Sequence, residues 1–401
     1  MLPLFSANAH IVTPPDVLRG RLPAKWAELG PSLTAMDGGG QAVVFDGQVV
    51  AALHRTCTMG GAVHEPEWRT DLVGFNTIAS LDELRPGCYD AAQRVADMDA
   101  DGIAAAACFS DPAGLGFGTE LFSTARDPEF GLACLRAWND WYAEEWVGVA
   151  PDRLVPVGAP WYLDPVVAGE EVRRNAARGF RGVVLRNPVD LDQPWLGASH
   201  WDPFLRACEE TDTVIVHHTE ALPTFPKRGG PANNMYPYGM TLSLYQACAM
   251  DFLTACLWGG LFSRFPRLRV LICESGGSWL PHFVRRLDWT MQHSPLTRAG
   301  WPDPDVAPLE AIQHLCWFST QELDLVGTLR EELGITKWLF EDDYPHIESV
   351  WPHTQEAFAT GTAGLDADAV ERLAWREGSE LFRFPIPSTT STTPAGAHAD
   401  A

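Results

Sequence analysis

The feature that most constrains the fold of this chain is a regular alternation of short apolar strands with amphipathic helices after residue 90. Strand patterns occur at 102–109, 153–161, 180–187, 213–218, 268–277, 316–322 and 337–343. Helical patterns lie at 90–100, 127–148, 165–178, 201–211, 241–264, 279–293 and 325–333. Such alternation favours a parallel sheet with right-handed crossovers. With the strand LFSANAHIV near the start of the chain, eight units are present, which predicts an α/β fold, a (β/α)8 TIM barrel.

We expect this barrel to span residues 1–385 of the 401-residue chain, a length within the range of the fold. Residues 31–85 are irregular and contain a hairpin pattern around Asp46-Gly47, which indicates an insertion after the first strand, near the barrel mouth. Residues 386–401 are small and polar, as is typical of a disordered tail.

Charge and composition exclude several classes of partner. The formal net charge of −23 argues against nucleic acid and anionic membranes, because both bind basic surfaces. No window is apolar over the length of a membrane span, and the start of the chain lacks the pattern of a signal peptide. Nine dispersed cysteines without a CxxC pair indicate reduced thiols. We therefore expect a cytoplasmic protein that acts on a small molecule, and we expect a homo-oligomer, a dimer.

Polar, chemically active side chains gather where four of the expected strands end. The last strand runs into Glu341, Asp342 and Asp343, with Tyr344, Pro345 and His346 directly after them. Buried carboxylates and imidazoles are costly unless a metal or a proton transfer uses them, and strand ends form the active sites of parallel barrels. The run therefore indicates an enzyme rather than an exposed acidic turn.

The other three strand ends carry matching groups. Asn8 and His10 are two residues apart, so both leave the same face of the first strand. His217 and His218 lie on opposite faces of their strand, so one of them can point into the barrel, and Glu274 ends the strand at 268–277. Each histidine alone is more often structural, but four such strand ends together favour a site for a divalent metal, which needs three protein ligands and an open position.

Several ordered segments resemble one enzyme family. They are SANAHIVTPPD (6–16), RPGCYDAAQRVADMDADGI (85–103), NDWYAEEW (139–146), APDRLVPVGAPWYLDP (150–165), HWDPFLRACEET (200–211), FSRFPRLRVLICESGGSWLPHFVRRLDW (262–289) and DDYPHIESVWP (342–352). In this order they are similar to amidohydrolase-related (amidohydrolase 2) enzymes of the branch of aminocarboxymuconate-semialdehyde decarboxylase and gamma-resorcylate decarboxylase. The resemblance covers nearly all of residues 1–385.

The resemblance implies a divalent metal, zinc or manganese, held at Asn8, His10, His217 and Asp343, with Glu274 at a catalytic position. Two departures bear on the metal. Asn8 stands where the family has an acid, and Thr13 stands where it has a glutamate. Because an amide brings no charge, either the metal is held more weakly or the enzyme works without one. A non-catalytic barrel is the third alternative.

The relatives imply non-oxidative decarboxylation of a small aromatic or unsaturated carboxylate, in which an acid protonates the carbon as carbon dioxide leaves. The alternative is hydrolysis of an amide, ester or lactone with Asp343 as base. Asp343, Glu274 and His218 are the predicted proton-transfer groups. Arg186, after the strand at 180–187, and His346 are the predicted substrate-binding groups; an ion pair at the barrel rim is an equal alternative for Arg186.

Overall fold

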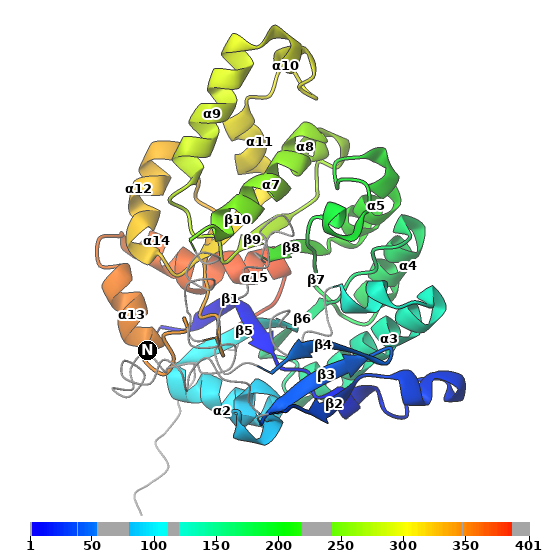
Figure 1. Cartoon of the computed structure of the whole chain (residues 1–401). Helices are drawn as coiled ribbons and strands as arrows, with labels where there is room; N and C mark the ends of the chain where they lie inside the picture. Colours follow the sequence, from blue (N-terminus) through cyan, green and yellow to red (C-terminus); the bar gives the residue numbers. More distant parts are fainter. Residues whose placement is uncertain are drawn as a thin grey trace, which may run out of the picture.

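The computed structural model describes residues 2–37, 39–53, 80–110, 120–218, 243–346 and 348–386. Its main sheet has eight parallel strands in the order β1-β5-β6-β7-β8-β9-β10-β11. They are β1 (Leu4–Ile11), β5 (Ile103–Ser110), β6 (Leu154–Gly158), β7 (Gly182–Val184), β8 (Val214–His218), β9 (Val270–Cys273), β10 (Cys316–Thr320) and β11 (Trp338–Phe340). Each strand pairs with the next strand of the repeat, and helices surround the sheet (Figure 1).

The sheet closes between its first and last strands. The Asp343 N–H donates to the Asn8 carbonyl at 3.1 Å, and the His10 N–H donates to the Tyr344 carbonyl at 2.7 Å. These bonds join the end of β1 to the segment just after β11, so the two ends of the repeat meet at the carboxyl edge of the barrel. The predicted (β/α)8 barrel is confirmed.

At least one helix overlaps each of the predicted helical ranges. The helices are α2 (Ala91–Asp101), α3 (Pro128–Trp141), α4 (Pro165–Ala176), α5 (Asp202–Thr211), α7 (Tyr245–Trp258), α8 (Leu261–Arg264), α9 (Leu280–His293), α10 (Pro295–Ala299), α11 (Pro308–Leu315), α12 (Leu323–Leu333), α13 (Thr354–Gly361), α14 (Ala367–Glu371) and α15 (Glu377–Phe382). The helix expected at 241–264 is divided into α7 and α8. The division falls at Gly260, whose φ of 65° lies in the left-handed region that ends helices.

The core has two parts, one inside the barrel and one between the strands and the helices. Alternation along β8 illustrates the division: Val214 and Val216 belong to the inner cluster, whereas Ile215 belongs to the outer one. Helix α15 covers the amino end of the barrel, where Phe382 stacks on Phe5 with ring centroids 5.8 Å apart. The amino end is thus packed, and the polar side chains collect at the opposite end.

A separate antiparallel sheet follows β1. It contains β2 (Ser32–Ala35), β3 (Gln41–Phe45) and β4 (Gln48–Ala52), and the last two form the predicted hairpin, with Asp46 and Gly47 at positive φ. The Arg126 guanidinium pairs with the Asp46 carboxylate at 2.9 Å and ties this sheet to the segment before α3. The rest of the expected insertion, 54–79, and the tail beyond 386 lie outside the described residues.

Two further expectations concern helices and thiols. Among the described helices, none combines the length and the apolar character needed to cross a bilayer. The eight cysteines in the described segments are buried and form no disulfide with one another.

Candidate active site

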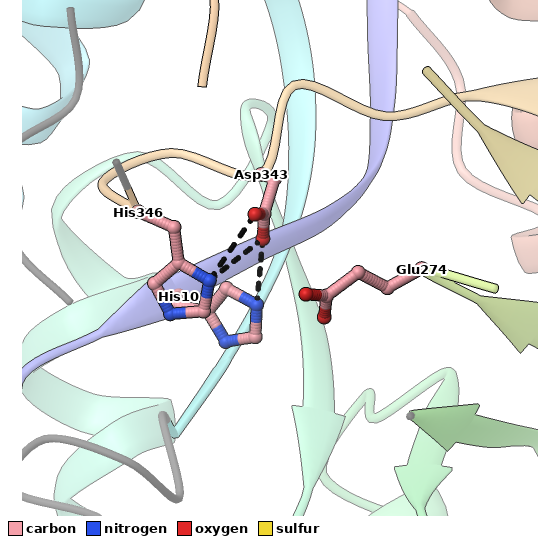
Figure 2. Close-up of side chains that lie close together, drawn as sticks. All are labelled: His10, Glu274, Asp343 and His346. Atoms are coloured by element: carbon pink, nitrogen blue, oxygen red, sulfur yellow. Dashed lines mark hydrogen bonds and ion pairs between the residues drawn. The ribbon is translucent and has the colours of Figure 1, made fainter. Parts of the chain in front are cut away.

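Six polar side chains converge at the carboxyl edge of the barrel. Asn8 and His10 come from β1, His218 from the end of β8, Glu274 from the residue after β9, and Asp343 and His346 from the segment after β11. Figure 2 shows His10 and His346 beside Asp343, with the Glu274 carboxylate pointing toward them from the other side. The four strand ends singled out in the sequence therefore meet in space.

Asp343 is the centre of this cluster. Its Oδ1 atom lies 3.1 Å from His10 Nε2 and 3.0 Å from His346 Nδ1. The Asn8 side-chain amide donates to the same oxygen at 3.3 Å. The side chain of Asp343 is 1% exposed, so these contacts form away from solvent. A buried carboxylate thus gathers two imidazoles and one amide around a single oxygen.

Glu274 and His218 form the second half of the cluster. Glu274 Oε2 lies 2.5 Å from His218 Nε2, and the ring centroids of His218 and His10 are 4.8 Å apart. The rings of His10 and His346 stack with centroids 4.0 Å apart. Because the His218 ring contacts the His10 ring, the Glu274–His218 pair lies next to the side chains around Asp343.

Both carboxylate residues leave their strands in the same backbone conformation. The φ angles are 55° at Glu274 and 54° at Asp343, in the left-handed region that non-glycine residues rarely adopt. The Glu274 N–H donates to Glu341 Oε2 at 3.2 Å, and the Asp343 N–H donates to the Asn8 carbonyl. Such strain persists only where surrounding contacts fix it, and it clusters at functional sites.

The placement of His217 differs from the expectation. Its ring stacks on Phe252 of α7 with centroids 4.0 Å apart, and its Nδ1–H donates to the Leu185 carbonyl at 3.1 Å. His217 is two residues after Ile215, so both side chains lie on the outer face of β8, between the strand and the helices. His218 has the inward parity. The sequence assignment of His217 as the residue facing the cluster is therefore corrected to His218.

Burial controls the charge of the cluster. Desolvation is the largest effect on His10, and with the neighbouring His346 it lowers the pKa of His10 to about 3, so this imidazole is neutral. Desolvation alone would raise the pKa of Asp343, but His346 and His10 outweigh it and hold that pKa below its usual range. Neutral imidazole and ionised carboxylate are the forms that bind metals.

Two more carboxylates lie behind the site. Desolvation raises the pKa of Glu341 to about 8, and Ser319 Oγ donates to its Oε2 at 2.5 Å. Desolvation likewise raises the pKa of Asp342 to about 6, and Ser6 Oγ donates to Asp342 Oδ1 at 2.7 Å. Each of these carboxylates accepts a hydrogen bond from a neighbouring serine hydroxyl. Of the run Glu341–Asp343, only Asp343 belongs to the cluster.

The cluster suits a divalent cation. One ligand atom from each of His10, Glu274, Asp343 and His346 can be chosen so that all four lie within 4.8 Å of one another. Neighbouring ligand atoms about 2.1 Å from one ion are separated by about 3.0–3.4 Å, which matches the contacts around Asp343 Oδ1. In addition, the buried Asn8 Oδ1 has no hydrogen-bond partner among the described residues. The donor set therefore fits the metal that the family resemblance implies.

A supporting network that sequence reasoning missed anchors the site to α2. The fully buried Arg94 guanidinium donates to the Gly87 carbonyl at 2.8 Å and to the His10 carbonyl at 2.5 Å, and it lies 4.3 Å from the Tyr344 ring centroid. The Tyr344 hydroxyl donates to Asp97 Oδ2 at 2.6 Å. A long-range pair of this kind has no local sequence signal, although an Arg and an Asp on the inner face of a predicted helix are unusual enough to be noticed.

Arg186 is placed near Glu120. Its guanidinium forms an ion pair with the Glu120 carboxylate, and its backbone N–H donates to the Tyr162 hydroxyl at 3.0 Å. The ion pair that was the alternative to a substrate-binding role is therefore present. A role in substrate binding stays a prediction, as does that of His346, whose ring lies within the cluster itself.

Comparison with known proteins gives the family. Residues 63–384 match the amidohydrolase family, and the chain belongs to it. A solved amidohydrolase from Mycobacterium avium subsp. paratuberculosis is similar, with a TM-score of 0.71 and 20% identity over 95% of this chain and 98% of that one.

Decarboxylases are among the similar proteins. A 5-carboxyvanillate decarboxylase from Novosphingobium aromaticivorans, solved with manganese and 4-hydroxy-3-methoxy-5-nitrobenzoic acid, has a TM-score of 0.64 and 16% identity over 95% of this chain and 96% of its own. The decarboxylase orsB of Emericella nidulans is 24% identical over 63% of this chain and 76% of its own length. The resemblance to the decarboxylase branch of the family is thereby confirmed.

Proposed function

We propose that this protein is a metal-dependent, non-oxidative decarboxylase of a small aromatic or unsaturated carboxylate. The observation that carries the proposal is the largely buried group of His10, Glu274, Asp343 and His346 at the carboxyl edge of the barrel, a mixed imidazole and carboxylate donor set. The similar decarboxylases, one of them solved with manganese, favour decarboxylation over the other chemistries of the fold.

The proposed metal is manganese or zinc. His10, Asp343 and His346 would hold it, Glu274 lies opposite them, and Asn8 can add a neutral oxygen. When bound, the cation would supply Lewis-acid stabilisation of the negative charge that develops on the substrate as carbon dioxide leaves. His217 has no part in this proposal, because it faces α7.

The proton that replaces the carboxylate has to come from the protein. The C–C bond to the carboxylate breaks, its electron pair stays on the substrate carbon, and one proton is transferred to that carbon. We propose His218 as the donor, since its inward-facing ring lies against Glu274, and a carboxylate at 2.5 Å stabilises the protonated imidazole. Glu274 then orients His218, and Asp343 keeps its charge throughout.

Hydrolysis of an amide, ester or lactone is the second candidate function. It is favoured by the ionised Asp343, which has the charge state of a general base. A metal-free or non-catalytic barrel is the third. The convergence of six polar side chains on one buried place weighs against it, because burial of these groups without a use destabilises the fold.

The experiment is a substrate panel with purified, manganese-loaded protein. Benzoates with a hydroxyl group ortho to the carboxylate are incubated in parallel with esters, lactones and anilides, and carbon dioxide and products are quantified. The proposal expects manganese-dependent carbon dioxide release from at least one benzoate and none with Asp343→Asn. Hydrolysis of the esters, lactones or anilides, without decarboxylation of any benzoate, would refute the proposal and favour the hydrolase.

We also propose that the protein acts in a reducing intracellular compartment and that it forms a homodimer. The first is supported by the buried thiols of the described cysteines. The second stays a prediction, which light scattering of the purified protein tests.

A further inference from the structure

The proposed metal site contains an unusual neutral ligand position. Asn8 stands on β1 beside His10, and its amide nitrogen donates to Asp343 Oδ1. Its carbonyl oxygen can coordinate but carries no charge. With Asn8 in place of an acid, Asp343 would be the only carboxylate that the described residues of β1 and of the segment after β11 offer to a divalent cation, and cation affinity rises with the number of charged ligands.

The other buried carboxylates of the last strand do not supply the missing charge. Asp342 accepts hydrogen bonds from the Ser6 hydroxyl and from the Tyr344 N–H. Glu341 accepts from Ser319 Oγ and from the Glu274 N–H. Both carboxylates are used in these hydrogen bonds. Neither belongs to the group whose ligand atoms lie within 4.8 Å of one another.

Glu274 does belong to that group, and it approaches from the opposite side of the barrel (Figure 2). Its Oε2 atom contacts His218 Nε2 at 2.5 Å, and one of its carboxylate oxygens lies within 4.8 Å of ligand atoms of His10, Asp343 and His346. Its left-handed backbone is fixed by Glu341, so the conformation that aims this carboxylate at the cluster is built into the fold.

We propose that the negative charge missing at Asn8 is supplied from β9, so that Glu274 is a charged metal ligand and restores two carboxylates to a site that would otherwise have one. This inference rests on the proposed metal dependence and deepens it. It assigns to Glu274 a role in metal affinity, in addition to its contact with His218.

A double-mutant cycle at Asn8 and Glu274 tests this. Chelator-stripped full-length protein is titrated with MnCl2 alone, and free Mn²⁺ is measured by electron paramagnetic resonance for the wild type, Glu274→Gln, Asn8→Asp and the double variant. Glu331→Gln, which removes one exposed charge from α12, is the matched control. The unfolding temperature without manganese is measured first, and Glu274→Ala replaces Glu274→Gln if the latter does not fold.

Glu274→Gln is expected to weaken manganese binding by about 100-fold or more, since loss of even an indirect ligand partner costs 10- to 100-fold. Asn8→Asp should recover most of this loss in the Glu274→Gln background and raise affinity less in the wild type, where two carboxylates are already present. Unchanged affinity in Glu274→Gln would overturn the proposal, and so would a double variant no better than Glu274→Gln.

The two proposals fail in different ways. If the cycle shows this coupling but no carboxylate is decarboxylated, the ligand role of Glu274 stands and the proposed reaction falls. If decarboxylation requires manganese but Glu274→Gln binds manganese as tightly as the wild type, the proposed reaction is supported and the ligand role of Glu274 is refuted. Wild-type protein that binds no manganese overturns both.

Discussion

Replacing His217 and His218 by glutamine, one at a time, gives two variants that differ only in which face of β8 is changed. The His217 ring stacks on Phe252, and its Nδ1–H donates to the Leu185 carbonyl. The aromatic pair contributes about 0.5–1.5 kcal/mol. The hydrogen bond contributes a similar net amount, about 0.5–1.5 kcal/mol. His217→Gln should therefore lower the free energy of unfolding by about 1–3 kcal/mol, the sum of these two terms.

His218→Gln should lower catalytic activity rather than stability. Loss of a positioned proton donor lowers kcat by about 10²- to 10⁴-fold. His218 contacts the site through Glu274, and loss of such an indirect partner lowers metal affinity by about 10- to 100-fold, so manganese binding should weaken but persist. Urea unfolding, manganese titration and steady-state kinetics on both variants are the assays. If His217→Gln abolishes manganese binding and His218→Gln leaves kcat unchanged, the parity assigned to β8 is wrong.

Three other expectations can be measured directly. Manganese at about 100 times its Kd should raise the free energy of unfolding by about 2.7 kcal/mol, seen as a higher Tm that a chelator reverses; an unchanged Tm would refute specific binding to the folded chain. Tyr344→Phe should cost about 1–3 kcal/mol of stability, because the buried Asp97 loses its hydroxyl donor. Burial raises the pKa of Asp101, so the folded state binds its proton more tightly and unfolding free energy falls as pH rises from about 4. Asp101→Asn should remove that part of the pH dependence in urea titrations.

The barrel could be predicted from sequence because its evidence is local. Each strand and helix shows its own period, and the order of elements then leaves few topologies. The strand ends carrying Asn8, His10, Glu274 and Asp343 could be identified in the same way, since a parallel barrel brings the carboxyl ends of its strands together.

The orientation of individual side chains could not be predicted. Either of two adjacent histidines at the end of β8 could face inward, and only the packing of Ile215 and His217 against the outer layer decides between them. The ion pair of Arg186 with Glu120 and the contact of Tyr344 with Asp97 join residues far apart in the chain. Such contacts depend on the closed barrel and leave no local pattern.

Anomalous diffraction from crystals of the manganese-loaded protein, collected at the manganese edge, tests the central claim most directly. One peak is expected among His10, Glu274, Asp343 and His346, with ligand atoms at about 2.0–2.2 Å. The Asn8 oxygen should lie at or next to the ion, and His217 should remain against Phe252. A peak held by His217, or no peak in this cluster from protein that is active with manganese, would contradict the claim.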